Sequence, residues 1–199
     1  MDKIICLVGP SGSGKTTIAK ELEKEGYNVI QSYTTRKPRH KGEWGHIFVS
    51  KNAINHVNEW DLVAIKELYE DYYWSTKDQY QGKGTSIYVV DPDGAEQVRE
   101  NVKDAKVITI FLMVDEEVRE ARLLYRVLIR EGLNEKEARS TAEIRLLRNE
   151  NIETTNIPDR IEKDRKIFSK CKCDYVVDAN RELNKVVEDI KEIIETEEN

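Results

Sequence analysis

The sequence carries a glycine-rich segment of the kind that binds phosphate. Residues 9–16 read Gly-Pro-Ser-Gly-Ser-Gly-Lys-Thr, which fits the pattern G-x-x-x-x-G-K-[ST] in full. Glycines let a backbone wrap around an anion with its N–H groups pointing inward, in conformations that a Cβ would resist. The residues expected to hold a nucleotide here are Gly9, Ser11, Gly12, Ser13, Gly14, Lys15, Thr16 and Thr17.

The neighbours of this segment, which we call the P-loop, have the order that phosphate binding needs. The apolar run Ile4–Val8 predicts a buried strand before it, and Thr16–Lys24 predicts a helix after it. The N-terminus of that helix adds unpaired N–H groups and a positive dipole end. We expect Lys15 to reach the outer phosphates as a catalytic residue and the Thr16 hydroxyl to ligate Mg²⁺. The motif alone leaves open an ATPase, a GTPase, a kinase or a nucleic-acid motor.

A second anion site is predicted shortly after the first. Residues 32–39 read S-Y-T-T-R-K-P-R, with Arg36 and Arg39 on either side of Pro38 in a basic stretch. Two guanidinium forks held in this way suit a phosphate group. In a chain of net charge −6, such a pair close to a P-loop indicates an acceptor that is itself phosphorylated. The simpler alternative is a solvated basic turn.

These residues resemble the guanylate kinase family, whose monophosphate-binding signature S-x-T-T-R-x-P-R is complete here. Three further segments resemble family motifs in the same order along the chain: 42–49, 71–76 and 91–98. The resemblance extends over nearly the whole chain. It implies an ATP- and Mg²⁺-dependent kinase that transfers the γ-phosphate to a nucleoside monophosphate, with GMP or dGMP as the first expectation.

The resemblance also implies roles for individual residues. Arg36, Arg39 and Tyr73 would hold the acceptor phosphate, and Ser32 and Ser75 would hydrogen-bond the base. Asp91 would lie near the acceptor sugar and Mg²⁺, as a water-mediated ligand. The arginines expected to clamp the transferring phosphoryl group as catalytic residues are Arg122, Arg126 and Arg145, with Arg148 as the alternative to Arg145.

The match departs from the family at three positions. His46 stands where the family has a phosphate-contacting Tyr, which predicts pH-sensitive phosphate binding near neutrality. Val89 replaces the first of two Asp residues, and Ala64 replaces the Glu that reads guanine. Unpaired N–H donors on guanine would cost about 1–3 kcal/mol each. Another acceptor base, including an unusual or deoxy one, therefore stays open.

Three glutamates are candidates to replace the missing base-reading carboxylate. Glu67 and Glu70 would each need a shift in strand register, and Glu43 would need a loop rearrangement. Glu67 lies an odd number of residues from Ala64, so a bulge would have to bring it to the same face.

Three rival classes remain beside the nucleotide kinase. A non-catalytic guanylate-kinase-like module that binds phosphopeptides is favoured only by Ala64 and Val89, since the P-loop keeps Lys15 and Thr16. A regulatory P-loop NTPase would leave the signature at 32–39 unexplained. The same signature counts against a shikimate- or sugar-type kinase.

The elements that must position these residues alternate between strand and helix. Further buried strands are predicted at Asn28–Gln31, Ile87–Val90, Val107–Val114 and Tyr175–Val177, and shorter ones at Ile47–Val49 and Leu62–Tyr69. A short helix is predicted at Lys51–Glu59, and longer ones at Ala95–Val102, Glu116–Arg130, Asn134–Glu153, Asp159–Lys170 and Leu183–Ile194. This order predicts a P-loop α/β fold with three α/β/α layers and a central parallel sheet.

The chain is expected to be a single domain, 1–199, with two appended parts. The core would comprise about 1–31, 85–120 and 157–199, with an inserted strand-rich lobe for the nucleoside monophosphate at about 32–84. A helical lid would span about 121–156. The P-loop and the acceptor signature would then lie at the junction of the core with these parts.

Composition limits the partners. The acidic net charge gives no global attraction to nucleic acid or to an anionic membrane. The first apolar run is too short for a signal peptide or a membrane span. We therefore expect a cytoplasmic monomer or homodimer.

Cys6, Cys171 and Cys173 are expected to be free thiols, since their spacing matches no zinc site.

Overall fold

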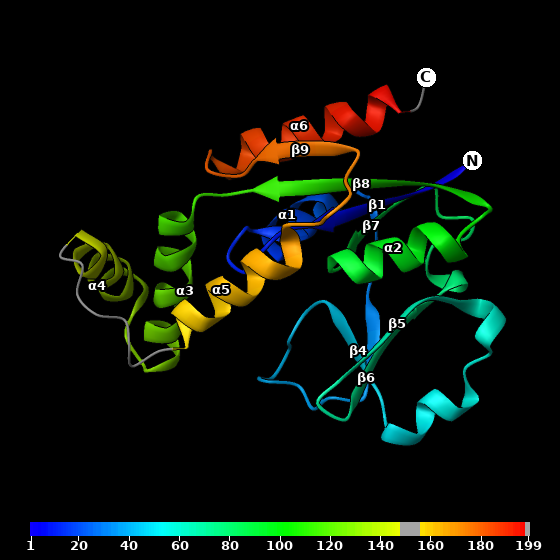
Figure 1. The fold of residues 1–199 in the computed structure, drawn as a ribbon, viewed down its shortest axis with the longest axis horizontal. Helices are drawn as coiled ribbons and strands as arrows, with labels where there is room; N and C mark the ends of the chain where they lie inside the picture. Colours follow the sequence, from blue (N-terminus) through cyan, green and yellow to red (C-terminus); the bar gives the residue numbers. More distant parts are fainter. Residues whose placement is uncertain (148–155, 198–199) are drawn as a thin grey trace.

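The computed structural model describes residues 1–147 and 156–197. Strands and helices alternate along most of this chain (Figure 1). The elements in chain order are β1 (Asp2–Val8), α1 (Lys15–Lys24), β2 (Asn28–Ile30), β3 (Ser32–Thr34), β4 (His46–Phe48), the 3₁₀ helices η1 (Lys51–His56) and η2 (Glu59–Asp61), β5 (Leu62–Leu68), β6 (Asp71–Thr76), the 3₁₀ helix η3 (Lys77–Gln79), β7 (Thr85–Val89), α2 (Pro92–Asn101), β8 (Ala105–Met113), α3 (Glu116–Arg130), α4 (Glu135–Leu147), α5 (Ile157–Phe168), β9 (Tyr175–Asp178) and α6 (Leu183–Thr196).

A parallel sheet with the strand order β2-β7-β1-β8-β9 forms the centre. The middle strand β1 is buried on both faces, which explains its unbroken apolar run. Ile5 and Leu7 pack in the cluster that contains residues of α1 and α6. Ile4 and Cys6 pack on the other face with residues of α2. The predicted three-layer α/β/α fold with a central parallel sheet is confirmed.

A second, smaller sheet is inserted between β2 and β7. Its strand order is β4-β3-β6-β5, and in Figure 1 it lies on the side of the central sheet that α2 covers. β3 continues almost directly from β2, with only Gln31 between them. This short connection fixes the acceptor signature at the junction of the two sheets.

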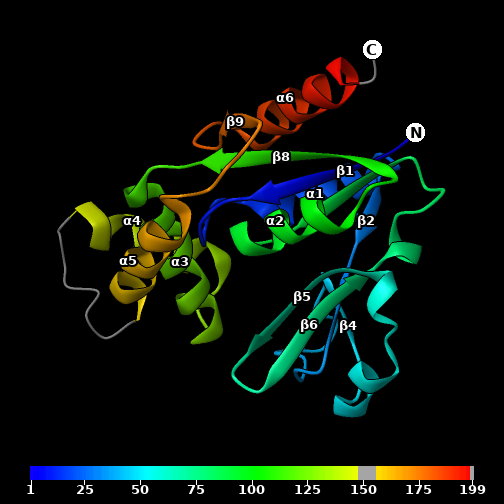
Figure 2. The same ribbon diagram turned by 45° about the vertical axis from the view of Figure 1, so that its right-hand side comes forward.

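Helices α3, α4 and α5 gather at the end of the central sheet toward which the strands β1 and β8 point (Figure 2). They share a separate core, made by Leu123, Leu124, Leu128, Ala138, Ala142, Ile157 and Ile161. Ligands of parallel sheets bind at the carboxyl ends of the strands. The helical cluster therefore stands over the edge where a ligand is expected.

Some predicted elements differ from those observed. Ser32–Thr34 and Asp71–Thr76, which were not among the predicted strands, are strands that pair with each other. Residues 51–61 form the 3₁₀ helices η1 and η2 in place of a single short helix.

Helix α2 begins at Pro92, before the predicted Ala95, because Asp91 caps it and accepts a hydrogen bond from Gly94 N at 2.8 Å. The division of the chain into core, lobe and lid stays a prediction. Among the described residues, no helix has both the length and the apolar character needed to cross a bilayer.

Candidate active site

The P-loop is built on glycines in the left-handed backbone region. Gly12 and Gly14 have φ values of 87° and 96°. A Cβ on Gly12 would also meet the backbone of Arg119 at 3.3 Å. Helix α1 begins at Lys15 and receives no hydrogen bond from an N-cap side chain. Its first N–H groups are therefore available to an anion.

The Lys15 ammonium group lies against the P-loop itself. Nζ donates to the carbonyl oxygens of Gly9 at 2.6 Å and Pro10 at 3.0 Å, and lies 3.5 Å from Ser13 Oγ. Burial lowers the pKa of Lys15 to about 8; Asp164 opposes this shift, while nearby arginines add to it. Thr16 and Thr17 are exposed in the first turn of α1, so the Thr16 hydroxyl is accessible from solvent.

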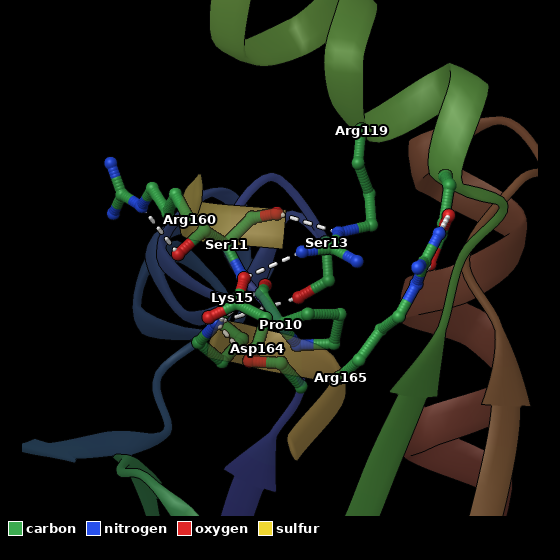
Figure 3. A network of polar contacts seen from close by, with 10 residues as sticks. Pro10, Ser11, Ser13, Lys15, Arg119, Arg160, Asp164 and Arg165 are labelled. Atoms are coloured by element: carbon green, nitrogen blue, oxygen red, sulfur yellow. Dashed lines mark hydrogen bonds and ion pairs between the residues drawn. The ribbon is translucent and has the colours of Figure 1, made fainter. Parts of the chain in front are cut away.

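Three side chains from helices α3 and α5 form hydrogen bonds with Ser11 of the P-loop (Figure 3). Asp164 Oδ2 accepts from Ser11 N at 2.8 Å and from an Arg119 NH2 group at 2.5 Å. Arg119 Nε also donates to Ser11 O at 3.0 Å, and Arg160 Nε donates to Ser11 Oγ at 2.8 Å. The sequence analysis identified none of these three side chains.

The three arginines predicted to clamp the phosphoryl group differ in position. Arg122 donates to Gly12 O at 3.0 Å and to Ala179 O at 3.1 Å. Burial and then the charge of Arg160 lower the pKa of Arg126. Arg145 lies on α4, but its side chain is outside the described structure, as is the whole of Arg148. Arg122 and Arg126 both line the cavity beside the P-loop, and their role toward a phosphoryl group stays a prediction.

A cavity of about 490 Å³ opens beside the P-loop. It is bounded by α1, α3, α4 and the segment that follows β9. The lining includes Gly12, Ser13, Thr17, Ile18, Arg122, Tyr125, Arg126, Arg139, Glu143, Ala179, Arg181 and Val186. This volume suits the base and sugar of a nucleotide whose phosphates rest on the P-loop.

The predicted acceptor site is centred on Arg36. Its guanidinium group forms a two-point ion pair with Glu43, at 2.8 and 3.2 Å, and Nε donates to Tyr73 Oη at 3.1 Å. The ring of Phe48 lies 5.4 Å from the guanidinium carbon. Because of Arg36, the pKa of Glu43 falls to about 2. The structure thus brings Arg36 and Tyr73 together, and their role toward a phosphate stays a prediction.

Arg39 connects the two predicted sites. Its backbone N–H donates to Glu43 Oε2 at 2.6 Å, while 65% of its side chain is exposed. Arg39 lies close enough to Arg160 for its charge to lower the pKa of Arg160, after the larger effects of burial and Asp164. Arg160 in turn contacts Ser11 of the P-loop.

His46 lies on β4 with its ring 5.6 Å from that of Tyr73. Burial, followed by the charge of Arg36, lowers the pKa of His46. The imidazole is therefore neutral at neutral pH in this geometry. Its charged form is confined to a more acidic range than the sequence predicted.

The pocket expected to hold the base contains hydroxyl groups. Ser32 Oγ and Tyr88 Oη are 3.0 Å apart, and Ser75 is buried on β6. Ala64 pairs with Ser75 across the strands, so its side chain faces the same side of the small sheet. Position 64 therefore lies on the face of the small sheet that carries Ser75.

None of the three candidate glutamates takes that position. Glu67 pairs with Tyr72 and faces the opposite side of β5, and Glu70 is exposed in the hairpin turn with a φ of 66°. Glu43 is bound to Arg36. Lys66, two residues after Ala64 on the same face of β5, forms ion pairs with Asp91 and, at 3.3 Å, with Asp93.

Long-range contacts explain why sequence reasoning missed Arg119, Arg160, Asp164 and Lys66. The three helical residues lie on charge-rich helices, where the sequence does not distinguish a buried charged side chain from an exposed one. One signal could have found Arg160, because it precedes Ile161 in the same Arg–aliphatic order as Arg145 and Leu146.

The fold and the two anion sites define a P-loop phosphotransferase of the α/β class. A profile of the AAA domain family matches residues 5–142. Guanylate kinase from Clostridium tetani is 30% identical over 188 residues, which cover 88% of this chain and 90% of that protein. Guanylate kinase from a Wolbachia species of Brugia malayi is 29% identical over 98% of this chain and 92% of its own length. This chain belongs to the guanylate kinase family.

A solved structure supports the fold. The crystal structure of guanylate kinase from Anaplasma phagocytophilum aligns with a TM-score of 0.61 at 20% identity, covering 98% of this chain and 86% of that one. The likeness concerns the arrangement of the sheet and its flanking helices.

Proposed function

We propose that this protein is an ATP-dependent nucleoside monophosphate kinase whose first acceptors are GMP and dGMP. The names of its relatives support the reaction. One structural observation supports the transfer between two sites. Arg160 contacts Ser11 of the P-loop, and the charge of Arg39 lowers the pKa of Arg160. A donor phosphate on the P-loop and an acceptor phosphate at Arg36 and Arg39 would then meet between α5 and the small sheet.

The P-loop would hold the donor. The N–H groups at the start of α1 and the Lys15 ammonium group would bind the outer phosphates, and Thr16 would hold Mg²⁺. Mg²⁺, when bound, neutralises charge on the β- and γ-phosphates. Arg122 and Arg126 would stabilise the charge on the transferring group, and so would Arg145 if its side chain reaches the site.

The acceptor phosphate would bind to Arg36, Arg39 and Tyr73, with His46 beside them. An oxygen of this ionised phosphate would attack the γ-phosphorus while the bond to the β,γ-bridging oxygen breaks, giving ADP and a nucleoside diphosphate. The attacking oxygen carries no proton, so no general base is needed. Catalysis would therefore rest on positioning and charge stabilisation.

The base would be held by Ser32 and Ser75, with Asp91 at the sugar. In the present geometry Asp91 Oδ1 caps α2 and Oδ2 binds Lys66. Lys66 would have to move before Asp91 could serve a nucleotide or a metal-bound water. Because Ala64 supplies no hydrogen-bond acceptor, we propose that guanine is selected less strictly than a carboxylate there would allow.

The remaining parts of the proposal concern the setting of the enzyme. We propose Mg²⁺ as the metal, a cytoplasmic location, and a monomer or homodimer that acts without nucleic acid or membrane. The lobe at 32–84 and the lid at 121–156 would close over the two nucleotides and exclude water.

The test is ADP release from ATP in the presence of GMP, dGMP, AMP, dAMP, UMP, dTMP or CMP, each compared with a reaction without acceptor. We expect GMP or dGMP to give the highest kcat/KM. ADP release that no monophosphate accelerates would contradict the proposal and favour a regulatory NTPase. Phosphopeptide binding without turnover would favour the binding module.

A further inference from the structure

A buried ion pair joins two helices to the P-loop. Arg119 comes from α3 and Asp164 from α5, and their side chains are 4% and 11% exposed. Both also bind the backbone of Ser11, Arg119 at its carbonyl oxygen and Asp164 at its N–H group. Three segments that are far apart in the sequence therefore meet at one carboxylate oxygen (Figure 3).

A second ion pair joins the same two helices without touching the P-loop. Arg165 of α5 contacts Glu116 of α3, and their side chains are 62% and 40% exposed. Exposed pairs of this kind contribute little to stability. The Arg165–Glu116 pair therefore serves as a matched control for the buried pair.

We propose that Asp164 is a positioning residue that fixes the donor-phosphate loop through Ser11 and ties it, through Arg119, to the helix that carries Arg122 and Arg126. This inference rests on the proposed function. An ion pair needed only to hold α3 against α5 would not have to bind the loop. The Asp164–Arg119 pair does bind the P-loop, through one hydrogen bond from each side chain to the Ser11 backbone. The position of the loop therefore depends on Asp164.

Asp164→Asn tests this role, with Glu116→Gln as the control. For Asp164→Asn we expect kcat/KM for ATP to fall about tenfold or more. The KM of the monophosphate should change little. Glu116→Gln should match the wild type.

A double variant separates positioning from stability. Removing one partner of a buried pair leaves an uncompensated charge, whereas replacing both by apolar residues is often neutral for stability. Arg119→Met with Asp164→Leu should therefore recover the melting temperature lost in Asp164→Asn. It should not recover kcat/KM for ATP, because the anchor on Ser11 N is gone. Recovery of both would overturn the proposal.

Binding of a fluorescent ATP analogue measures the same loss without any acceptor. We expect Asp164→Asn to weaken this binding about tenfold while Glu116→Gln leaves it unchanged. Equal binding by the wild type and Asp164→Asn would contradict the positioning role even if no monophosphate proved to be a substrate. A wild type that binds the analogue but phosphorylates no monophosphate would contradict only the proposed function.

Discussion

At the scale of single residues, Lys15 carries most of the expected chemistry. Its ammonium group is held by carbonyl oxygens of the loop that would receive the phosphates. Lys15→Ala should lower kcat roughly a hundred- to a thousandfold or more and leave the fold intact, because one positioned charge donor is lost. Steady-state ADP release and circular dichroism check the two parts. Full activity in this variant would remove the P-loop from the mechanism.

The pKa of Lys15 gives a separate prediction for the wild type. Burial lowers this pKa to about 8 in the free protein. The charged form binds phosphate, so kcat/KM for ATP should be constant below that pH. Above it, the value should fall about tenfold per pH unit. A pH profile that stays flat to about pH 10 would show that the charge of Lys15 is not needed.

Ala64 offers a prediction about the base. Its cross-strand partner is Ser75, so a longer side chain at 64 would point toward the predicted base pocket. Ala64→Glu would give guanine a carboxylate for its amine and ring N–H groups, worth about 1–3 kcal/mol for each donor. We expect the ratio of kcat/KM for GMP to that for IMP to rise roughly fivefold or more. Ala64→Gln is the uncharged control, and an unchanged ratio in Ala64→Glu would show that position 64 does not contact the base.

The residues that the sequence revealed are those with local signals. The P-loop glycines and Lys15 follow a fixed spacing, and Arg36 and Arg39 flank a proline. Asp164 could not be predicted, because its contact with Ser11 joins residues 153 positions apart. An Asp on a helix rich in Lys and Arg looks the same in sequence whether it faces solvent or a buried guanidinium group.

At the scale of elements, the loop between β3 and β4 forms the predicted acceptor site. Arg39 is an exposed cation of this loop, and its charge lowers the pKa of Arg160 after the larger effects of burial and Asp164. Arg39→Ala should raise the KM of the monophosphate about tenfold or more and change the KM of ATP much less. Initial rates with each substrate varied in turn provide the measurement. Equal changes in both KM values would argue against a separate acceptor site.

Glu43 stabilises the same loop by accepting hydrogen bonds from the Arg36 guanidinium group and from the Arg39 N–H group. Arg36 and the Arg39 N–H group lower the pKa of Glu43 from 4.5 to about 2. A carboxylate with a lowered pKa stabilises the fold above its unfolded pKa, and this stabilisation is lost as the pH falls through the folded value. Glu43→Gln should therefore unfold about 1–3 kcal/mol more easily near pH 6, with the difference shrinking as the pH approaches about 3. Urea unfolding at several pH values tests this, and a difference independent of pH would contradict it.

Secondary-structure elements were predicted correctly where the burial of apolar side chains determines them. Strands that depend on pairing with neighbouring strands were missed. β1 and β8 are apolar runs, and α3 begins and ends at the predicted residues. β3 and β6 are short and polar, and each is stabilised by its partner strands. Their sequences alone gave no alternation long enough to identify them.

At the scale of the whole molecule, the account depends on two anion sites that share one space. The P-loop lies at the carboxyl end of β1, and the acceptor site lies on the small sheet. Helix α5 contributes Arg160 and Asp164 to the P-loop side. This arrangement predicts direct transfer of the phosphoryl group and exclusion of water from it.

The most direct measurement follows a radiolabelled γ-phosphate of ATP in a single turnover with GMP present. The account predicts that nearly all of the transferred label appears in GDP, with only a small share in inorganic phosphate. Label that appears in inorganic phosphate at the same rate with and without GMP, and never in GDP, would contradict transfer between the two sites.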